Sequence, residues 1–210
     1  MPKVFSHESP EYNTPEQENG ALLYSKEIVK YFIPNIKTTR NWVTIRKVPF
    51  AFDHSIVFIH NNLHPSFYDY LKNYKDLILV CGVPSTCEKV RHLGKTIYLP
   101  LSVPVREILK YKTKPTKCSC YAGRRNKFAS CNVPLSIPHL SDLPHDEFLK
   151  ELATYRKTYA VGRVAIEAKV LGLEVLPYDP RFPDPSVWKV LDTFDAIKML
   201  QQELDYIDGV

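Results

Sequence analysis

A chain of 210 residues, of which 44% are hydrophobic and 24% are charged, has the composition of a globular protein with a sizeable core. No apolar run approaches the ~18 residues that a transmembrane helix needs, which excludes such a helix. The first twenty residues also lack the apolar centre of a signal peptide. We therefore expect a protein of a bacterial or viral-host cytoplasm, with no membrane span.

Five cysteines, an odd number, argue for thiols in a reducing compartment rather than for a disulfide framework. Cys118 and Cys120 are separated by one residue, which is closer than the usual gap between zinc ligands, and no second close pair follows. We expect no metal site.

Positive charge is concentrated in one stretch of the chain, although the net charge is only +5. Residues 110–127 contain seven basic side chains and no acidic one. They are Lys110, Lys112, Lys114, Lys117, Arg124, Arg125 and Lys127. Such a run is typical of a diphosphate site, of a surface that follows a nucleic-acid backbone, or of a solvated linker.

Short apolar runs alternate with helical patterns in the first half of the chain. Strands are expected at 3–5, 42–45, 56–60, 77–81 and 96–99. Helices are expected at 21–32, 65–74 and 85–93. This alternation with short connections predicts a parallel sheet with helices on both faces.

A proline-containing segment at 99–117 interrupts the alternation and predicts a domain boundary near residues 100–112. Beyond it, strands are expected at 117–122 and 173–177, and helices at 145–155, 162–171 and 187–206. The predicted fold class is α/β, with two Rossmann-like units of parallel sheets flanked by helices. The units are expected to span 1–105 and 106–210, with ligands at the carboxyl ends of the strands.

The segment that begins at Tyr159 carries the chemistry of a nucleotide site. Gly162 is expected at the start of a helix, where unpaired N–H groups and the helix dipole favour a phosphate. Arg163 would add positive charge there. Glu167 follows about one turn later, where a carboxylate can accept hydrogen bonds from ribose hydroxyls.

The wording EAKVLGLEVLPYD, from Glu167 to Asp179, resembles the donor-nucleotide half of GT-B glycosyltransferases. The resemblance implies that Glu167 holds the ribose of the donor. It also implies a strand that ends in glycine and arginine, followed by a lysine, with both basic side chains on the donor phosphates. Gly123, Arg124 and Lys127 match that order.

Two further positions bear on the reaction. His60 lies at the end of an expected strand of the first, acceptor-side unit and could act on the sugar or the acceptor. Tyr159 stands eight positions before Glu167, where retaining GT-B families have a glutamate that contacts the donor sugar. Either backbone groups hold the sugar, or the donor differs, or the site binds a nucleotide without transferring sugar.

The expected function is that of a small, metal-independent glycosyltransferase without a prosthetic group, using a UDP- or GDP-sugar. Its acceptor is unidentified, and a polyanion such as DNA could lie along Lys110–Lys127. The alternative is a GT-B-like protein that binds a nucleotide, a nucleotide sugar or a macromolecule without catalysis. A third interpretation is a nucleic-acid-binding protein that uses the same basic run.

Overall fold

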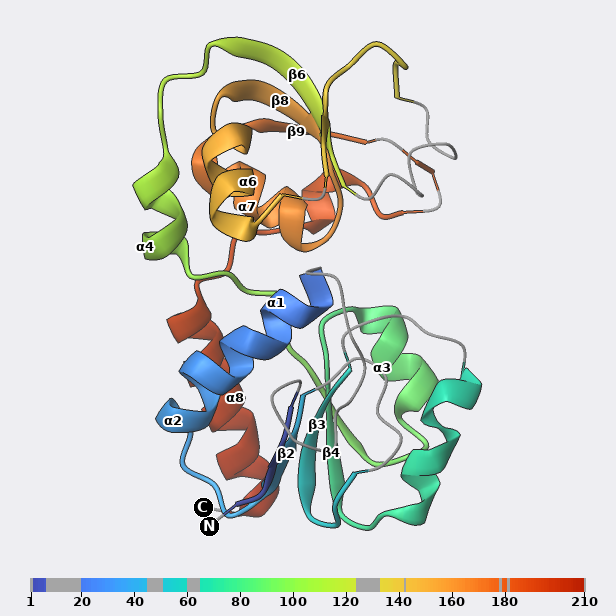
Figure 1. The fold of residues 1–210 in the computed structure, drawn as a ribbon. Helices are drawn as coiled ribbons and strands as arrows, with labels where there is room; N and C mark the ends of the chain where they lie inside the picture. The colour runs from blue at the N-terminus through green and yellow to red at the C-terminus, as the bar shows by residue number, and fades with distance from the viewer. Residues whose placement is uncertain are drawn as a thin grey trace. The chain divides into compact units, whose positions relative to one another are not determined.

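Two separate parallel β-sheets organise the chain in the computed structural model (Figure 1). The structure describes residues 2–6, 20–44, 51–59, 65–123, 133–141, 143–177, 179–180 and 182–209. One unit comprises Met1–Pro100 together with Phe194–Val210, and the other comprises Leu101–Thr193. The predicted fold class, α/β with two parallel sheets flanked by helices, is confirmed.

The sheet of the first unit has five strands in the order β1-β2-β3-β4-β5, and every neighbouring pair is parallel. The strands are β1 (Val4–Phe5), β2 (Asn41–Val43), β3 (Ser55–Ile59), β4 (Leu77–Cys81) and β5 (Lys95–Tyr98). All residues of β3 and β4 are buried. Continuous apolar runs suit this position, because a central parallel strand is covered on both faces.

Successive side chains of these strands point to opposite faces of the sheet, and each face has its own helical cover. On one face Phe58 packs against Tyr24 and Phe32, with ring centroids 6.2 and 6.0 Å away. On the other face, Val57 and Leu79 share a core cluster with residues of the opposite helical layer. Figure 1 shows α1 and α8 on one side of the sheet and α3 on the other.

The helical segments of the first unit differ in winding. They are α1 (Gly20–Glu27), the π-helix η1 (Ile28–Phe32), α2 (Ile33–Asn35), the 3-10 helix η2 (Pro65–Asn73), α3 (Pro84–Val90) and α8 (Thr193–Asp208). The sequence predicts one helix over 21–32, whereas the structure changes from α to π winding after Glu27.

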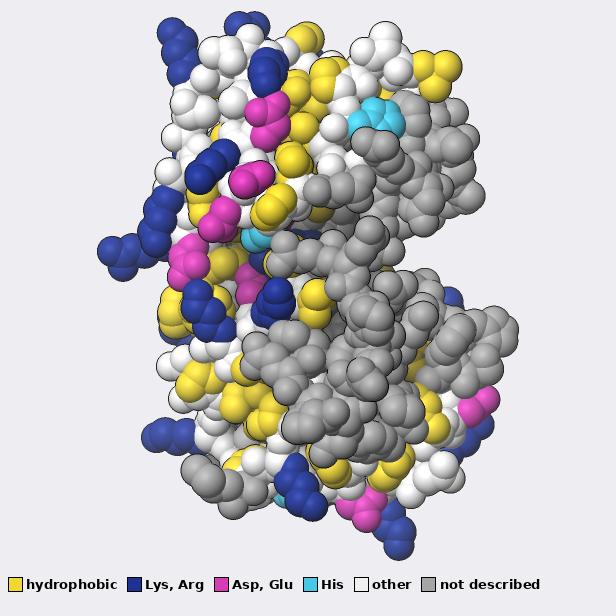
Figure 2. All heavy atoms as spheres, viewed as in Figure 1, with side chains coloured by type: hydrophobic (Ala, Val, Ile, Leu, Met, Phe, Trp, Pro, Cys, Tyr) yellow, Lys and Arg dark blue, Asp and Glu magenta, His cyan; other side chains and the backbone are white. Residues whose placement is uncertain are grey.

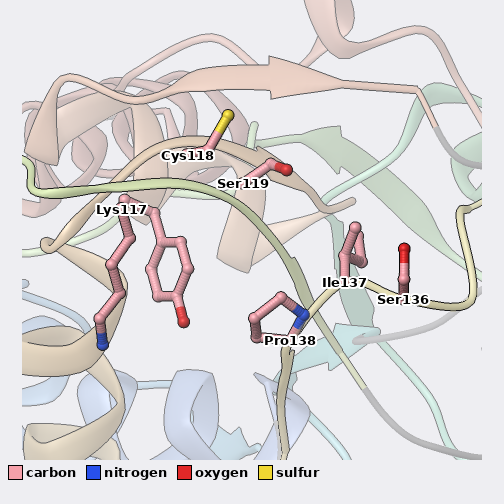
Figure 3. Close-up of a pocket in the computed structure, with 7 residues that line it drawn as sticks. Lys117, Cys118, Ser119, Ser136, Ile137 and Pro138 are labelled. Atoms are coloured by element: carbon pink, nitrogen blue, oxygen red, sulfur yellow. The ribbon is translucent and has the colours of Figure 1, made fainter.

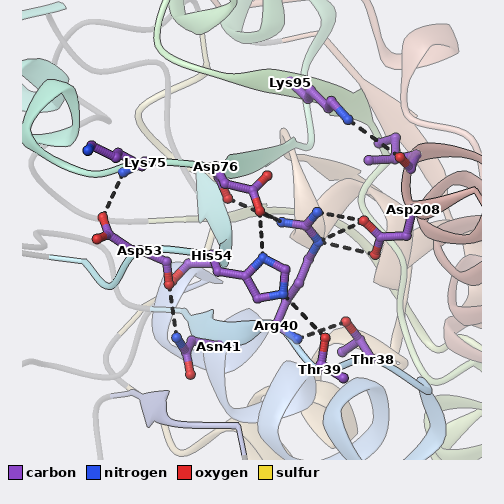
Figure 4. A network of polar contacts seen from close by, with 12 residues as sticks. Thr38, Thr39, Arg40, Asn41, Asp53, His54, Lys75, Asp76, Lys95 and Asp208 are labelled. Carbon is purple, nitrogen blue, oxygen red and sulfur yellow. Dashed lines mark hydrogen bonds and ion pairs between the residues drawn. The ribbon is translucent and has the colours of Figure 1, made fainter.

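The last helix, α8, belongs to the first unit from Phe194 onward, whereas the sequence-based division places it in the second. The carboxyl end of α8 is held by ion pairing with Arg40, a residue that directly precedes β2 and is only 4% exposed (Figure 4). Nε of Arg40 donates to both carboxylate oxygens of Asp208 at 3.2 Å, and Nη1 lies 3.0 Å from Oδ2 of Asp76. Asp76 also pairs with Nδ1 of His54. We call these four residues the Arg40 cluster.

The second unit contains four parallel strands in the order β7-β6-β8-β9. They are β6 (Lys117–Ala122), β7 (His139–Leu140), β8 (Tyr155–Tyr159) and β9 (Glu174–Leu176). Its helical segments are α4 (Val105–Ile108), the 3-10 helix η3 (Leu109–Tyr111), α6 (His145–Leu152), α7 (Arg163–Leu171) and the 3-10 helix η4 (Pro185–Val187). Leu152 and Ile166 from α6 and α7 pack in one core cluster with Cys120 and Ala122 of β6.

Strand order reverses within this second sheet. From β6 the chain moves to β7 on one side, and then returns to place β8 on the other side of β6. Such a reversal creates a topological switch point, at which open parallel sheets bind ligands beyond the carboxyl ends of the strands. In the second unit the switch point lies between β6 and β8.

Candidate functional site

The two glycines predicted for phosphate binding follow the two strands that flank the switch point. Gly123 comes directly after β6, and Gly162 stands at the start of α7, three residues after the end of β8. Tyr121 of β6 is paired with Tyr159 of β8, so these two strand ends lie side by side. The sheet therefore brings both glycine-bearing loops to one edge.

Gly162 has a backbone conformation that favours glycine. Its φ is 62° and its ψ is −137°, a region that L-amino acids with a Cβ rarely adopt. A Cβ placed on this residue would meet no atom within 4 Å. Open space therefore adjoins the first turn of α7, where helical N–H groups lack partners within the helix.

Gly123 is required by packing as well. A Cβ at this position would lie 2.8 Å from Oη and 3.0 Å from Cζ of Tyr121. The Tyr121 ring is fully buried and lies 5.2 Å from the ring of His139. A glycine here thus has a structural reason that does not depend on a ligand.

Glu167 and Arg163 lie together on the first turns of α7, but they engage each other. Nε of Arg163 donates to Oε1 of Glu167 at 2.7 Å, and His145 approaches the same oxygen through Nε2 at 3.0 Å. The Glu167 side chain is 1% exposed, that of Arg163 is 7% exposed, and that of His145 is 21% exposed. We call these three residues the Glu167 cluster.

Electrostatics keep the Glu167 carboxyl ionised. Burial acts to raise its pKa, but the charge of Arg163 and the hydrogen bond from His145 outweigh burial and hold the pKa below its ordinary value. Both contacts fall on Oε1, and among the residues that the structure describes none hydrogen-bonds to Oε2. Since the side chain is 1% exposed, the carboxylate is an internal group of the Glu167 cluster.

Three predicted site residues fall outside the described part of the chain. They are His60, Arg124 and Lys127. Their roles toward the sugar and the phosphates stay predictions.

His145 is a candidate that the sequence analysis did not identify. It opens α6, directly after the loop that follows β7, and α6 therefore starts at the same carboxyl edge as α7. The only signal in the sequence is a histidine behind a proline at a helix start. That signal is weak, because the two-residue strand β7 has no recognisable pattern of its own.

A shallow hollow of about 520 Å³ lies elsewhere on the second unit (Figure 3). Its lining residues are Lys117, Cys118, Ser119, Ser136, Ile137, Pro138 and Tyr155. Nζ of Lys117 pairs with Glu151 and lies 5.1 Å from the centre of the Tyr155 ring. Because the hollow involves the amino-terminal half of β6, it does not coincide with the switch point.

The described part of the basic run is spread along the chain rather than folded into one site. Lys110, Lys112 and Lys114 are exposed, and Lys117 is neutralised by Glu151. On the face shown in Figure 2, basic side chains are interspersed with acidic ones. This arrangement does not single out a nucleic-acid surface.

Two general features concern metals and membranes. Within the described ranges, no three His, Cys, Asp or Glu side chains are grouped so that they could hold a metal ion. Helices in the same ranges are too short or too polar to span a bilayer.

Comparisons of the chain with protein-family models, with curated proteins and with solved structures gave no significant match.

Proposed function

We propose that the second unit binds the nucleotide diphosphate of a nucleotide sugar at its carboxyl edge, between β6 and β8. One observation carries this proposal: the strand order reverses between two strands whose following loops both contain a predicted glycine, Gly123 and Gly162. The open space at Gly162 leaves room for a phosphate at the first turn of α7. The ribose contact predicted for Glu167 is not favoured by the geometry, because this side chain is 1% exposed and is engaged by Arg163 and His145.

We further propose metal-independent glycosyl transfer as the reaction, from the resemblance of Glu167–Asp179 to GT-B glycosyltransferases. The bond between the sugar and the diphosphate breaks, and negative charge grows on the departing phosphate oxygen. N–H groups of α7 together with Arg124 and Lys127 would stabilise that charge. His60 is proposed to face the sugar or the acceptor, which stays unidentified.

Binding without turnover is the second candidate, and Tyr159 favours it. This residue occupies the position of the sugar-binding glutamate and packs beside Tyr121 in an apolar cluster. An aromatic side chain held in such a cluster supplies no carboxylate to a sugar. The two candidates share the nucleotide site and differ only in turnover.

Calorimetry and thermal shift with UDP, GDP, UDP-glucose and GDP-mannose test the site. Gly162→Ala should weaken binding at least tenfold, because the methyl group enters the space proposed for the phosphate and the backbone must leave its φ of 62°. Gly209→Ala is the matched control, since Gly209 also has a positive φ, 73°, and open space around its Cβ position. It should lose stability alone and bind the ligand as the parent does.

Equal affinities of the two glycine variants, or no binding to the parent chain, would remove the proposed site. Release of free nucleotide diphosphate from a bound donor then separates the two candidates. An enzyme should hydrolyse the donor slowly without an acceptor and lose this activity in Arg124→Ala. A binding protein should bind the donor and leave it intact.

A further inference from the structure

Two thiols meet in the first unit, between the sheet and α3. Cys81 is the last residue of β4, and Cys87 lies in the middle of α3. The two side chains are hydrogen-bonded to each other, and Cys87 packs against the core cluster that contains Cys81. The turn between the strand and the helix therefore brings the two sulfur atoms into contact.

The neighbouring strand places the two thiols at the same point. In the sheet, Cys81 is paired with Tyr98 of β5. The thiol of Cys87 donates to the carbonyl oxygen of Ile97, the residue directly before Tyr98, at 3.8 Å. Because neighbouring strands lie about 4.8 Å apart, a side chain held at Ile97 is within reach of the side chain of Cys81. Strand pairing thus supports the contact independently of the hydrogen bond between the sulfur atoms.

The two thiols differ in exposure and in acidity. Cys81 is completely buried, whereas Cys87 is partly exposed. Burial raises the pKa of both thiols, and the hydrogen bond between them raises that of Cys81 further but acts to lower that of Cys87. Cys87 is therefore the thiol that loses its proton first, and the one that a small reagent in the solvent can reach.

We propose that Cys81 and Cys87 form a reversible oxidation site whose co-reactant is a small hydroperoxide such as hydrogen peroxide. The Cys87 thiolate attacks one peroxide oxygen, the O–O bond breaks, and hydroxide leaves while Cys87 becomes a sulfenic acid. The sulfur of Cys81 then attacks the sulfur of Cys87. A disulfide bond forms, the S–O bond breaks, and the departing hydroxide takes the thiol proton of Cys81 as water. The two sulfur atoms together supply the two electrons that reduce the peroxide.

The first unit already holds the two partners of this bond close together. The sulfur atoms have to approach only from hydrogen-bond contact to about 2.05 Å. The bond would link the carboxyl end of β4 to α3, two elements that already pack on each other through the core cluster of Cys81. The inference concerns the first unit alone and does not depend on the nucleotide site proposed for the second.

Mass spectrometry of the intact native chain tests the proposal without any substitution. Trypsin cuts after Lys75 and Lys89, so one peptide, 76–89, carries both thiols. The chain is treated with hydrogen peroxide at about pH 8.5, where more thiolate is present, and is then denatured in iodoacetamide after the peroxide is removed. The peptide should carry no label and should lack the two thiol hydrogen atoms. Dithiothreitol, added before iodoacetamide, should restore two labelled thiols.

A second tryptic peptide, 118–124, provides an internal control. It also carries two cysteines, but Cys118 is exposed whereas Cys120 is buried and donates to Oγ1 of Thr158 at 3.5 Å. Peroxide should therefore add oxygen to Cys118, and Cys120 should still be labelled after denaturation. The oxidation of Cys118 shows that the peroxide was effective in the same sample.

Two results would overturn the proposal. One is a peptide 76–89 in which both thiols are still labelled once Cys118 is fully oxidised. The other is oxidation of Cys87 to a sulfinic acid beside an unmodified Cys81, because the buried thiol would then fail to react with its neighbour.

Substitutions test the order of the two steps, with circular dichroism to confirm that each variant is folded. In Cys81→Ser the sulfenic acid has no thiol partner, so dimedone should label Cys87 after peroxide treatment. In Cys87→Ser the buried thiol of Cys81 should be oxidised at least roughly tenfold more slowly than the pair is in the parent. Oxidation of Cys81 at the parental rate in that variant would refute the assignment of Cys87 as the first thiol to react.

Discussion

The Arg40 cluster provides the most direct test of how the first unit is held together. Arg40→Met keeps most of the buried stem of the side chain and removes its guanidinium. The substitution breaks the ion pairs of Arg40 with the Asp208 carboxylate, at the end of α8, and with Asp76. Each carboxylate is then left without a partner that is itself buried.

The expected destabilisation follows from how far the partners are exposed. Removing one member of a fully buried ion pair costs about 3–5 kcal/mol. Here the side chains of Asp208 and Asp76 are 32% and 47% exposed, so water can solvate them once Arg40 is gone. We therefore expect a smaller decrease in the free energy of unfolding, about 2–3 kcal/mol, or roughly 5–10 °C in Tm for a chain of this size.

Urea unfolding followed by circular dichroism measures this decrease, and amide hydrogen exchange locates it. Exchange should accelerate in α8 and in the strands of the first unit. Lys72→Met is the control, because Lys72 pairs with Asp69 at a site where both side chains are more than half exposed. That variant should be destabilised by less than about 0.5 kcal/mol. Similar decreases in the two variants would refute the reasoning.

Acid should weaken the same cluster. A hydrogen bond from Arg40 lowers the pKa of Asp208. For Asp76, burial acts to raise the pKa, but the hydrogen bonds from His54 and Arg40 outweigh it and lower the pKa. A carboxyl group with a lowered pKa in the folded state stabilises that state at pH values above its ordinary pKa of about 3.9. This stabilisation is lost as the pH falls through the lowered pKa. The parent should therefore lose stability below about pH 4 more steeply than Arg40→Met.

Three further outcomes are expected. Gly123→Ala should cost about 1–2 kcal/mol by urea unfolding, and less in a Tyr121→Phe background, because Oη is the atom nearest to the added methyl group; equal costs in both backgrounds would contradict this. Lys169→Met should destabilise the chain by about 1–2 kcal/mol in the same assay, since its Nζ donates to the backbone carbonyls of Pro185 and Trp188, at the two ends of η4; an unchanged stability would show that these hydrogen bonds contribute nothing. Cys118 is exposed and should react with iodoacetamide in the native state, whereas Cys120, buried and with a pKa raised to about 11 by burial, should not, as mass spectrometry of peptides can show.

Strands with continuous apolar or β-forming sequence were predictable. The expected bounds of β4 and β6 agree with the structure, and β3 is displaced by one residue. The strand β8 was missed, although it lies in the middle of its sheet. Its sequence YRKTY has two charged residues, and Lys157 is accommodated by an ion pair with Glu174 of β9 at 2.8 Å. A cross-strand contact of this kind cannot be inferred before the pairing is known.

The candidate site was predictable only in part, for the same reason. Gly123 and Gly162 have local signals, because Gly123 follows a strand and Gly162 precedes a helix, each with a recognisable pattern. Their proximity depends on the pairing of β6 with β8, and this pairing depends on the strand that was missed. The hydrogen bond between His145 and Glu167 joins α6 to α7. The two residues are 22 positions apart in the chain, so no local sequence pattern specifies their contact.

The return of α8 to the first unit has a consequence for the order of synthesis. The second unit is continuous in sequence and is complete once Thr193 has left the ribosome. The first unit, although its strands precede the second unit in sequence, lacks a helix of one sheet face until residues 194–210 emerge. We therefore expect the second unit to fold before the first, and the sheet of the first unit to be vulnerable to proteases until residues 194–210 have emerged. Pulse-labelled ribosome-bound chains, digested before and after residues 194–210 emerge, would reveal that inverted order.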